Sequence, residues 1–377
     1  MSLRLLVAQV DLEGLNVRRF CAEHGISTWW FYELRRRYAA EGEAGLDPRS
    51  RAPHRVANRT PEALERWILD ARKLLEELGD DVGPASIHAR LKRNGVSPPS
   101  VSTIWRILVR EGAISPDPSK APKHAGHRFV AERANECWQT DDTGWELADG
   151  TPVKIINVLD DCSRLCVASR AVPSATGAAI FEAFTRAASE SGWPERVLCD
   201  NAKAHRNTLT DALGQLGVAI GHSRPYHPQT CGKVERFHFT VKQSLSAAPP
   251  PATIEELQAH LDWFRHRYNH ERPHSSLGRR TPAEVWAATP KSGPASRALD
   301  TPTEVHYLTV GRNGVVSAGR RYAIHLGIEH AHQPATIIAT GLACHVFIDA
   351  RLVRRLTLDP TRRHQPLHPR PGRPAKL

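Results

Sequence analysis

HPQTCGKVERFHFTVK, His227–Lys242, is the stretch of sequence that decides the fold. A loop with Pro and Gly leads into a helical pattern, whose apolar residues recur at the spacing of one helix face. These residues are Val234, Phe237, Val241 and Leu245. Glu235 lies on a different face of this helix, with His238 one turn and Lys242 two turns further on. An acid placed in this way at the start of a helix is a candidate metal ligand, and it needs partners.

Two upstream aspartates each end an apolar run that is typical of a strand. Asp141 stands in CWQTDDT and Asp200 in RVLCDNAKAH, and thirty-four residues lie between Asp200 and Glu235. Asp142 is the alternative to Asp141, because adjacent residues in a strand face opposite sides and only one of them can point at a site.

The bulk composition indicates a globular protein with a polyanionic partner. The chain has 377 residues, 40% hydrophobic and 24% charged, which allows two or three domains. Its net charge of +11 and its pI near 9.6 favour a nucleic acid as partner, although an ordinary basic surface is the alternative. The seven scattered cysteines indicate a reducing compartment, and their spacing does not predict a zinc site. Because no apolar run reaches about 18 residues, we expect a cytoplasmic protein without a membrane span.

Residues 1–58 are predicted to form a helix-turn-helix DNA-binding module. Gly25 can adopt positive φ in the turn, and Ser27 is the expected N-cap of the second helix. In such modules the second helix lies in the major groove, with its first residues facing bases and its cations facing phosphates. Its cations are Arg35, Arg36 and Arg37. A basic solvated face is the alternative interpretation.

Residues 59–113 are predicted to form a second helix-turn-helix module. Thr60 and Pro61 are the start signals of a long helix, a shorter helix is expected over Pro84–Asn94, and a third helix opens at Pro98. Two such modules in tandem can read a longer DNA site than one. The candidate DNA contacts of this module are Ser100, Thr103 and Arg106.

Residues 129–288, which follow a linker over 114–128, are predicted to form the central domain. Three β-patterned runs come first: Cys137–Leu147, Val153–Leu159 and Leu165–Val172. Asp160 and Asp161 follow the second run and are expected to cap a turn rather than bind metal. Helices and strands then alternate up to the Glu235 helix. The order βββαβαβα predicts an α/β layout with a mixed sheet.

This layout and its three acids resemble the ribonuclease H-like core of the integrase and transposase superfamily with an Asp-Asp-Glu triad. WQTDDT resembles the first-aspartate strand of that family, VLCDNAKAH the second, and SRPYHPQTCGKVERFHFTVKQ the loop and helix of the third acid. YNHERPHSSLGRRTPAEVW resembles the segment that closes the catalytic domain in transposases of bacterial insertion sequences, where tandem helix-turn-helix modules are also typical. The family often has Asp-Asn-Gly at its second acid, whereas Ala202 follows Asn201 here.

The resemblance implies a mixed five-stranded sheet and a catalytic, metal-binding triad. The triad residues are Asp141, Asp200 and Glu235. The implied cofactor is Mg²⁺ or Mn²⁺, as two ions, because a pair of ions about 4 Å apart activates the attacking oxygen and stabilises the leaving one. Lys242 matches a basic position that some members use to hold DNA. Further candidate DNA contacts are Lys233, Arg236 and His238; Lys233 could equally solvate its loop, and His238 could be a solvated helix residue.

The expected function is that of a DNA transposase. It binds the ends of an insertion sequence and catalyses metal-dependent cleavage and strand transfer into target DNA. The expected partner is double-stranded DNA, both element ends and target, with a homo-oligomer forming on it in the bacterial cytoplasm at the nucleoid. Two alternatives are a sequence-specific DNA-binding regulator with an inert integrase core and a nuclease of the same fold.

The C-terminal part is predicted to form a separate small domain. A linker over 289–303 ends the catalytic core, and residues 304–358 alternate in the manner of β-strands, which predicts a small β-barrel. Residues 359–377 are basic and rich in Pro, so we expect a disordered tail that binds phosphates nonspecifically.

Overall fold

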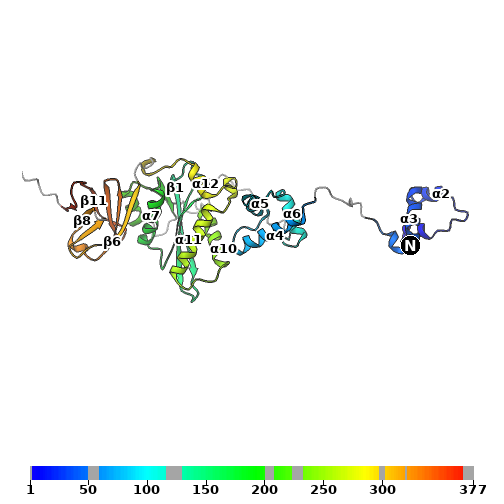
Figure 1. The fold of residues 1–377 in the computed structure, drawn as a ribbon, viewed down its shortest axis with the longest axis horizontal. Coiled ribbons are helices and arrows are strands. Elements are labelled where there is room, and N and C mark those ends of the chain that lie inside the picture. The colour runs from blue at the N-terminus through cyan, green and yellow to red at the C-terminus, as the bar shows by residue number, and fades with distance from the viewer. Residues whose placement is uncertain are drawn as a thin grey trace, which may run out of the picture. The chain divides into compact units, whose positions relative to one another are not determined.

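The computed structural model of the chain describes residues 2–49, 59–115, 130–199, 208–222, 232–296, 302–318 and 321–367. It divides into two compact units, Met1–Thr60 and Pro61–Leu377 (Figure 1). Among the helices of the described residues, none is long and apolar enough to cross a membrane.

The first unit contains the predicted helix-turn-helix. Its described elements are α1 (Leu3–Gln9), α2 (Val17–Glu23), α3 (Thr28–Glu41) and the 3-10 helix η1 (Gly42–Leu46). Ser27 caps α3 as predicted, because its side chain accepts a hydrogen bond from the backbone of Trp30, and Gly25 has φ of +65°. Helix α1 was not predicted. It buries Val7 against Phe31 and Leu34 of α3 and so completes a small core.

The second helical module packs around its own core. It consists of α4 (Glu62–Glu77), α5 (Pro84–Arg93) and α6 (Val101–Arg110). Ile68, Ile87 and Ile104 are fully buried between the helices. The predicted start of α4, with Thr60 as N-cap and Pro61 as the first helical residue, is wrong by one position. Pro61 is the N-cap residue and makes no side-chain hydrogen bond, and the helix begins at Glu62. The third helix begins at Val101 rather than Pro98, since Ser100 supplies its cap.

A five-stranded mixed sheet forms the centre of the second unit. Its strands are β1 (Cys137–Glu146), β2 (Pro152–Asp160), β3 (Cys166–Val172), β4 (Arg196–Cys199) and β5 (Ala219–His222). Their order is β3-β2-β1-β4-β5. Strands β1 to β3 form the antiparallel meander, whereas β4 pairs parallel to β1, and β5 pairs parallel to β4. The predicted mixed five-stranded sheet is confirmed.

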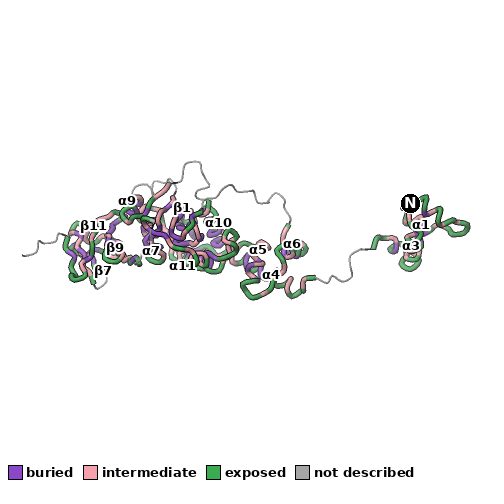
Figure 2. The backbone as a smooth tube through the Cα atoms, turned by 90° about the horizontal axis from the view of Figure 1, so that it is seen from above, coloured by how far each residue is buried: buried purple, intermediate pink, exposed green. Residues whose placement is uncertain are grey.

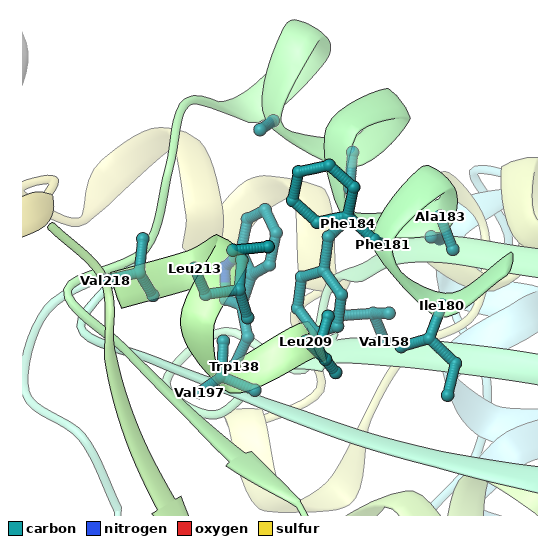
Figure 3. Close-up of a cluster of buried hydrophobic side chains, with 14 of the residues drawn as sticks. Trp138, Val158, Ile180, Phe181, Ala183, Phe184, Val197, Leu209, Leu213 and Val218 are labelled. Atoms are coloured by element: carbon teal, nitrogen blue, oxygen red, sulfur yellow. The ribbon is translucent and has the colours of Figure 1, made fainter. Parts of the chain in front are cut away.

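Helices cover both faces of this sheet. They are α7 (Gly177–Ser191) and α9 (Thr208–Gln215) on one face, α10 (Gly232–Ser246) and α11 (Ile254–His270) on the other, and α12 (Pro282–Ala288) beyond α11. Figure 3 shows Trp138 of β1 against Phe184 of α7, with a ring-centroid distance of 6.0 Å. On the opposite face, Phe237 of α10 packs against Phe264 and Tyr268 of α11. The buried segments in Figure 2 concentrate on this layered core.

The C-terminal strands form two sheets that are not closed into the predicted small barrel. The strands are β6 (Thr303–Thr309), β7 (Val315–Ala318), β8 (Tyr322–His325), β9 (Pro334–Thr340), β10 (Ala343–Ile348), β11 (Arg351–Thr357) and β12 (His364–Gln365). One sheet has the order β11-β10-β9-β6 and the other β12-β8-β7. Short 3-10 helices lie at Ser275–Leu277 (η3), Pro294–Ser296 (η4) and Ile328–His330 (η5).

These strands share a core with the central sheet, which the sequence did not predict. Phe347 of β10 packs against Phe181 of α7 at a centroid distance of 4.8 Å, and the Tyr307 and Thr185 hydroxyls are 2.6 Å apart. The predicted linker also packs on the core, because Ser292 donates a hydrogen bond to Glu195. The predicted disorder of the tail is wrong for residues 359–367, where β12 pairs with β8. Residues 368–377 lie outside the described residues.

Candidate active site

Asp141 of β1 lies on the sheet face that α10 covers. Its Oδ2 atom is 3.8 Å from Nδ1 of His238 on α10. The neighbouring Asp142 has a different partner, because its Oδ2 atom lies 2.9 Å from the ammonium of Lys154 on β2. Side chains of consecutive strand residues point to opposite faces, so Asp142 points away from α10. The geometry therefore favours Asp141 as the candidate ligand.

Glu235 stands in the first turn of α10 with an exposed side chain. The apolar positions of this helix are buried as predicted: Val234, Phe237, Val241 and Leu245. His238 follows Glu235 by three positions, a rise of roughly 4.5 Å along the helix axis, so the two side chains share a face. Because His238 lies beside Asp141, Glu235 stands about one helical turn before the residue of α10 that is next to the first acid.

His238 is a buried member of this site and not an ordinary solvated histidine. Its side chain is only 12% exposed. Burial first, and then the nearby charge of Lys242, lower the pKa of His238 to about 4, although Asp142 and a hydrogen bond with the Asp141 backbone act in the opposite direction. The imidazole is therefore neutral near pH 7. Its Nε2 atom is buried and has no hydrogen-bond partner among the residues that the structure describes.

Lys233 anchors the first turn of α10 to the sheet. Its ammonium lies 2.5 Å from Oδ1 of Asp161, and the exposed fractions of the two side chains are 16% and 0%. Gln139 of β1 donates to the same carboxylate at 2.6 Å, and the backbone of Ala131 donates to its other oxygen at 2.8 Å. Burial lowers the pKa of Lys233, against the opposing effect of the Asp161 charge. This gives Lys233 a structural partner, and its contact with DNA stays a prediction.

The two aspartates that end β2 have different roles. Asp160 accepts hydrogen bonds from the backbone and hydroxyl of Ser163 and from the backbone of Asn135, so it caps the turn as predicted. Burial raises the pKa of Asp160. Asp161 instead forms the buried pair with Lys233, which the sequence analysis missed because the two residues are 72 positions apart.

Asp200, the predicted second acid, lies outside the described residues, as does the loop 223–231 that precedes α10. Strand β4, which ends at Cys199, is the parallel neighbour of β1. Leu198 pairs with Gln139, and each of these residues stands two positions before an acid of the predicted triad. Within the described ranges there is no group of three His, Cys, Asp or Glu side chains that could hold a metal ion.

Two further candidates for DNA contact lie on the outer side of α10. Lys242 is exposed. The Arg236 side chain is 68% exposed, and its guanidinium lies 5.0 Å from the ring centroid of Phe239 and 3.9 Å from Asp81. Phe239 is itself 56% exposed. These cations are accessible to a phosphate backbone, so their predicted contacts remain possible in this geometry.

The arginines of α3 differ in their surroundings. Arg35 donates to the backbone carbonyls of Val7 and Val10 and so holds the end of α1. Arg37 donates to the carbonyl of Asp47. Arg36 is exposed and pairs with Glu33 at 2.9 Å. Arg35 and Arg37 therefore have structural roles that the sequence analysis did not foresee, and Arg36 is the most accessible of the three.

The candidates of the second module surround the start of α6. Ser100 caps this helix, and its hydroxyl lies 3.0 Å from that of Thr103. Arg106 is exposed one turn further on. The sequence analysis missed an exposed aromatic residue in each module, Trp105 at 42% on α6 and Trp29 at 72% on α3. The sequence contained evidence of this exposure, because neither tryptophan falls at the spacing of the buried apolar residues of its helix.

Comparisons with known proteins match parts of the chain to integrase core domains. Residues 131–228 and 216–282 match two family models that are each described as an integrase core domain, and residues 30–108 match a homeodomain-like domain. A protein of insertion element IS407 from Burkholderia multivorans is 26% identical over 233 residues, 59% of this chain and 82% of that protein. Transposase InsD of insertion element IS2 from Escherichia coli is 24% identical over 215 residues, 53% and 70% respectively. These matches support an integrase-core transposase of an insertion element.

Another insertion-element protein and two solved structures are also similar to this chain. An uncharacterized 39.2 kDa protein of insertion element IS476 from Xanthomonas euvesicatoria is 28% identical over 185 residues, and the chain spans only 53% of its length. Among solved structures, a simian T-cell lymphotropic virus intasome is 17% identical with a TM-score of 0.39, covering 76% of this chain and 99% of that chain. The magnesium-bound catalytic core of HTLV-2 integrase is 16% identical with a TM-score of 0.34, covering 42% and 99%.

Proposed function

We propose that the chain is a DNA transposase that binds insertion-element ends and catalyses metal-dependent cleavage and strand transfer. The observation that carries the proposal is the position of Asp141 on the face covered by the Glu235 helix, with His238 of that helix 3.8 Å from its carboxylate. Asp200 follows β4, the parallel neighbour of β1, and is proposed as the second acid of the triad. The matches to integrase core domains support this assignment.

The residues present fit divalent cations with oxygen ligands. Mg²⁺ and Mn²⁺ prefer carboxylates and water, and Asp141 and Glu235 supply carboxylates on the same side of the sheet. The Nδ1 atom of His238 lies near Asp141, and its Nε2 atom is buried without a hydrogen-bond partner among the described residues, so it could accept or donate a further polar contact at this site. When bound, a pair of such ions supplies activation of the attacking oxygen and stabilisation of the leaving oxygen. The three acids would hold the ions, and no covalent protein intermediate is required.

The other parts of the chain would hold the DNA. The modules over 1–58 and 59–113 are proposed to bind the element end through α3 and α6, whose exposed surfaces carry Arg36 and Arg106. Lys242, two helical turns after Glu235, would neutralise a phosphate near the cut. The apolar face of α10 is buried against the central sheet and α11, and this packing holds the helix in place. The C-terminal strands are proposed to add contacts with DNA or with a second subunit, in a homo-oligomer at the bacterial nucleoid.

A cleavage assay with the full chain tests this function. A labelled duplex of the element end, taken from the flanks of the coding sequence, is incubated with protein and Mg²⁺. We expect a new 3′-hydroxyl at the element end and joined products with a target plasmid, and we expect both to disappear when EDTA removes the metal. Binding without any cleavage at Mg²⁺ or Mn²⁺ would favour the regulator with an inert core. Cleavage without joined products would favour a nuclease of the same fold.

A further inference from the structure

The turn between α4 and α5 docks directly onto the helix that carries Glu235. Gly79 in this turn has φ of +65°, and a Cβ atom added there would lie 2.7 Å from the Cα of Ser244 and 2.9 Å from the carbonyl oxygen of Gln243. Backbone therefore meets backbone, with no room for a side chain between them. Gln243 also donates from its Nε2 atom to the carbonyl of Asp80 at 3.4 Å.

Buried charges hold the turn in this place. Asp80 binds two arginines of the core, with one carboxylate oxygen 2.6 Å from Arg267 and the other 2.8 Å from Arg272. These three side chains are between 9% and 13% exposed. Arg272 also forms an ion pair with Asp81, at a distance of 2.7 Å. Removing one partner of such an ion pair is strongly destabilising, because it leaves an uncompensated charge away from water.

A second contact lies further along the module. Arg93 at the end of α5 pairs with Glu284 of α12 at 2.8 Å and donates to the carbonyl of Glu271 at 3.0 Å. The module is thus attached at two separated points, the α4–α5 turn and the end of α5. Two attachments restrict rotation about either one, which favours a fixed arrangement of α4 to α6 and the Glu235 helix. Figure 1 shows α4 and α5 beside α10.

We propose that the Gly79–Asp81 turn fixes the distance between α6 and the Glu235 helix and thereby determines which phosphodiester of the element end is cut. The inference rests on the proposed function, in which α6 binds DNA and Glu235 takes part in cleavage. Since the attachments favour a fixed arrangement of the module and the acid, DNA held by α6 reaches the acids at a fixed distance from the recognised bases. Asp80 and Arg93 are positioning residues in this account, because they act through α10 to α12 and do not touch the reacting atoms.

The test is the position of the cut. Asp80→Asn weakens the link to Arg267 and Arg272, and Arg93→Ala removes the second, partly exposed attachment. Asp70→Asn, on the exposed side of α4, is the matched control. End-labelled element DNA is cut with Mg²⁺ and the products are resolved to one nucleotide, after thermal melting has shown which variants fold. If Asp80→Asn does not fold, Arg93→Ala decides.

Wild-type protein and the control are expected to cut at one phosphate. In the folded variants we expect unchanged affinity for the element end and cuts that are spread over neighbouring phosphates. We expect the cleavage rate at the original phosphate to fall by up to about 10²-fold, since a misplacement of 1 Å can have that effect. A loss of stability alone would lower every product equally. Variants that bind the element end and cut only at the wild-type position would show that the turn does not determine the position of the cut. Absence of cleavage by the wild type would instead refute the proposed function.

Discussion

Asp141→Asn is expected to lower the rate of metal-dependent DNA cleavage about a thousandfold or more while leaving binding to the element end unchanged. Asp141 faces α10, where its Oδ2 atom lies 3.8 Å from Nδ1 of His238, and it is proposed to bind the metal together with Glu235. The amide of Asn keeps the shape but removes the negative charge that a divalent ion requires. A thousandfold loss corresponds to ~4 kcal/mol of lost transition-state stabilisation. The measurement is single-turnover cleavage of a labelled end duplex, with a gel-shift titration of the same duplex.

Asp142→Asn is the matched control for this experiment. It changes the adjacent residue in the same way, but the Asp142 carboxylate pairs with Lys154 on the other side of the strand. We expect a cleavage rate within about threefold of wild type, a change of less than ~1 kcal/mol. A large loss in Asp142→Asn together with a nearly normal rate in Asp141→Asn would show that the two roles are assigned the wrong way round.

Asp161→Ala is expected to lower the free energy of unfolding of the second unit by about 3–5 kcal/mol. Asp161 is fully buried and binds the ammonium of Lys233 at 2.5 Å, so its removal breaks an ion pair that is largely withdrawn from water. Gln139 and the backbone of Ala131 lose their acceptor as well. The start of α10 would then detach more easily from the sheet. Urea denaturation, followed by tryptophan fluorescence, measures the change.

The Asp142→Asn variant serves again as a comparison. Its pair with Lys154 is partly exposed, at 22% and 47%, and pairs of this kind contribute roughly 0–1 kcal/mol. We expect its unfolding midpoint to stay close to that of the wild type. An Asp161→Ala variant as stable as Asp142→Asn would show that the buried pair does not hold α10 in place.

Local patterns explain which parts of the fold were predictable. Strand alternation and helix periodicity depend on nearby residues, so β1 to β3 and the buried face of α10 were predicted close to their observed positions. Features that depend on contacts between residues far apart in the sequence were not predictable from local patterns. Helix α1 is stable because Val7 meets α3, and β10 packs on α7 through Phe347, although the alternation alone had suggested a separate barrel.

The candidate site was predictable to a similar extent. Strand geometry limited the choice to Asp141 or Asp142, and the resemblance to the family motif favoured Asp141. The contacts with His238 and Lys154 show that the two carboxylates lie on opposite faces of the strand. The partner of Lys233 was not predictable, because Asp161 precedes it by 72 residues and had the pattern of a turn cap. In α3, three consecutive arginines looked equivalent, but a helix places consecutive residues on different sides, so Arg35 reaches backbone carbonyls while Arg36 is exposed.

The central claim is that Asp141, Asp200 and Glu235 hold divalent ions at one site. The most direct measurement is an anomalous difference map from crystals of the full chain soaked with Mn²⁺. We predict a peak, or two peaks about 4 Å apart, with carboxylate oxygens of all three acids within about 2.0–2.6 Å of the metal. A fully occupied manganese site elsewhere, with Asp141 and Glu235 bound to no metal at saturating concentration, would contradict the account.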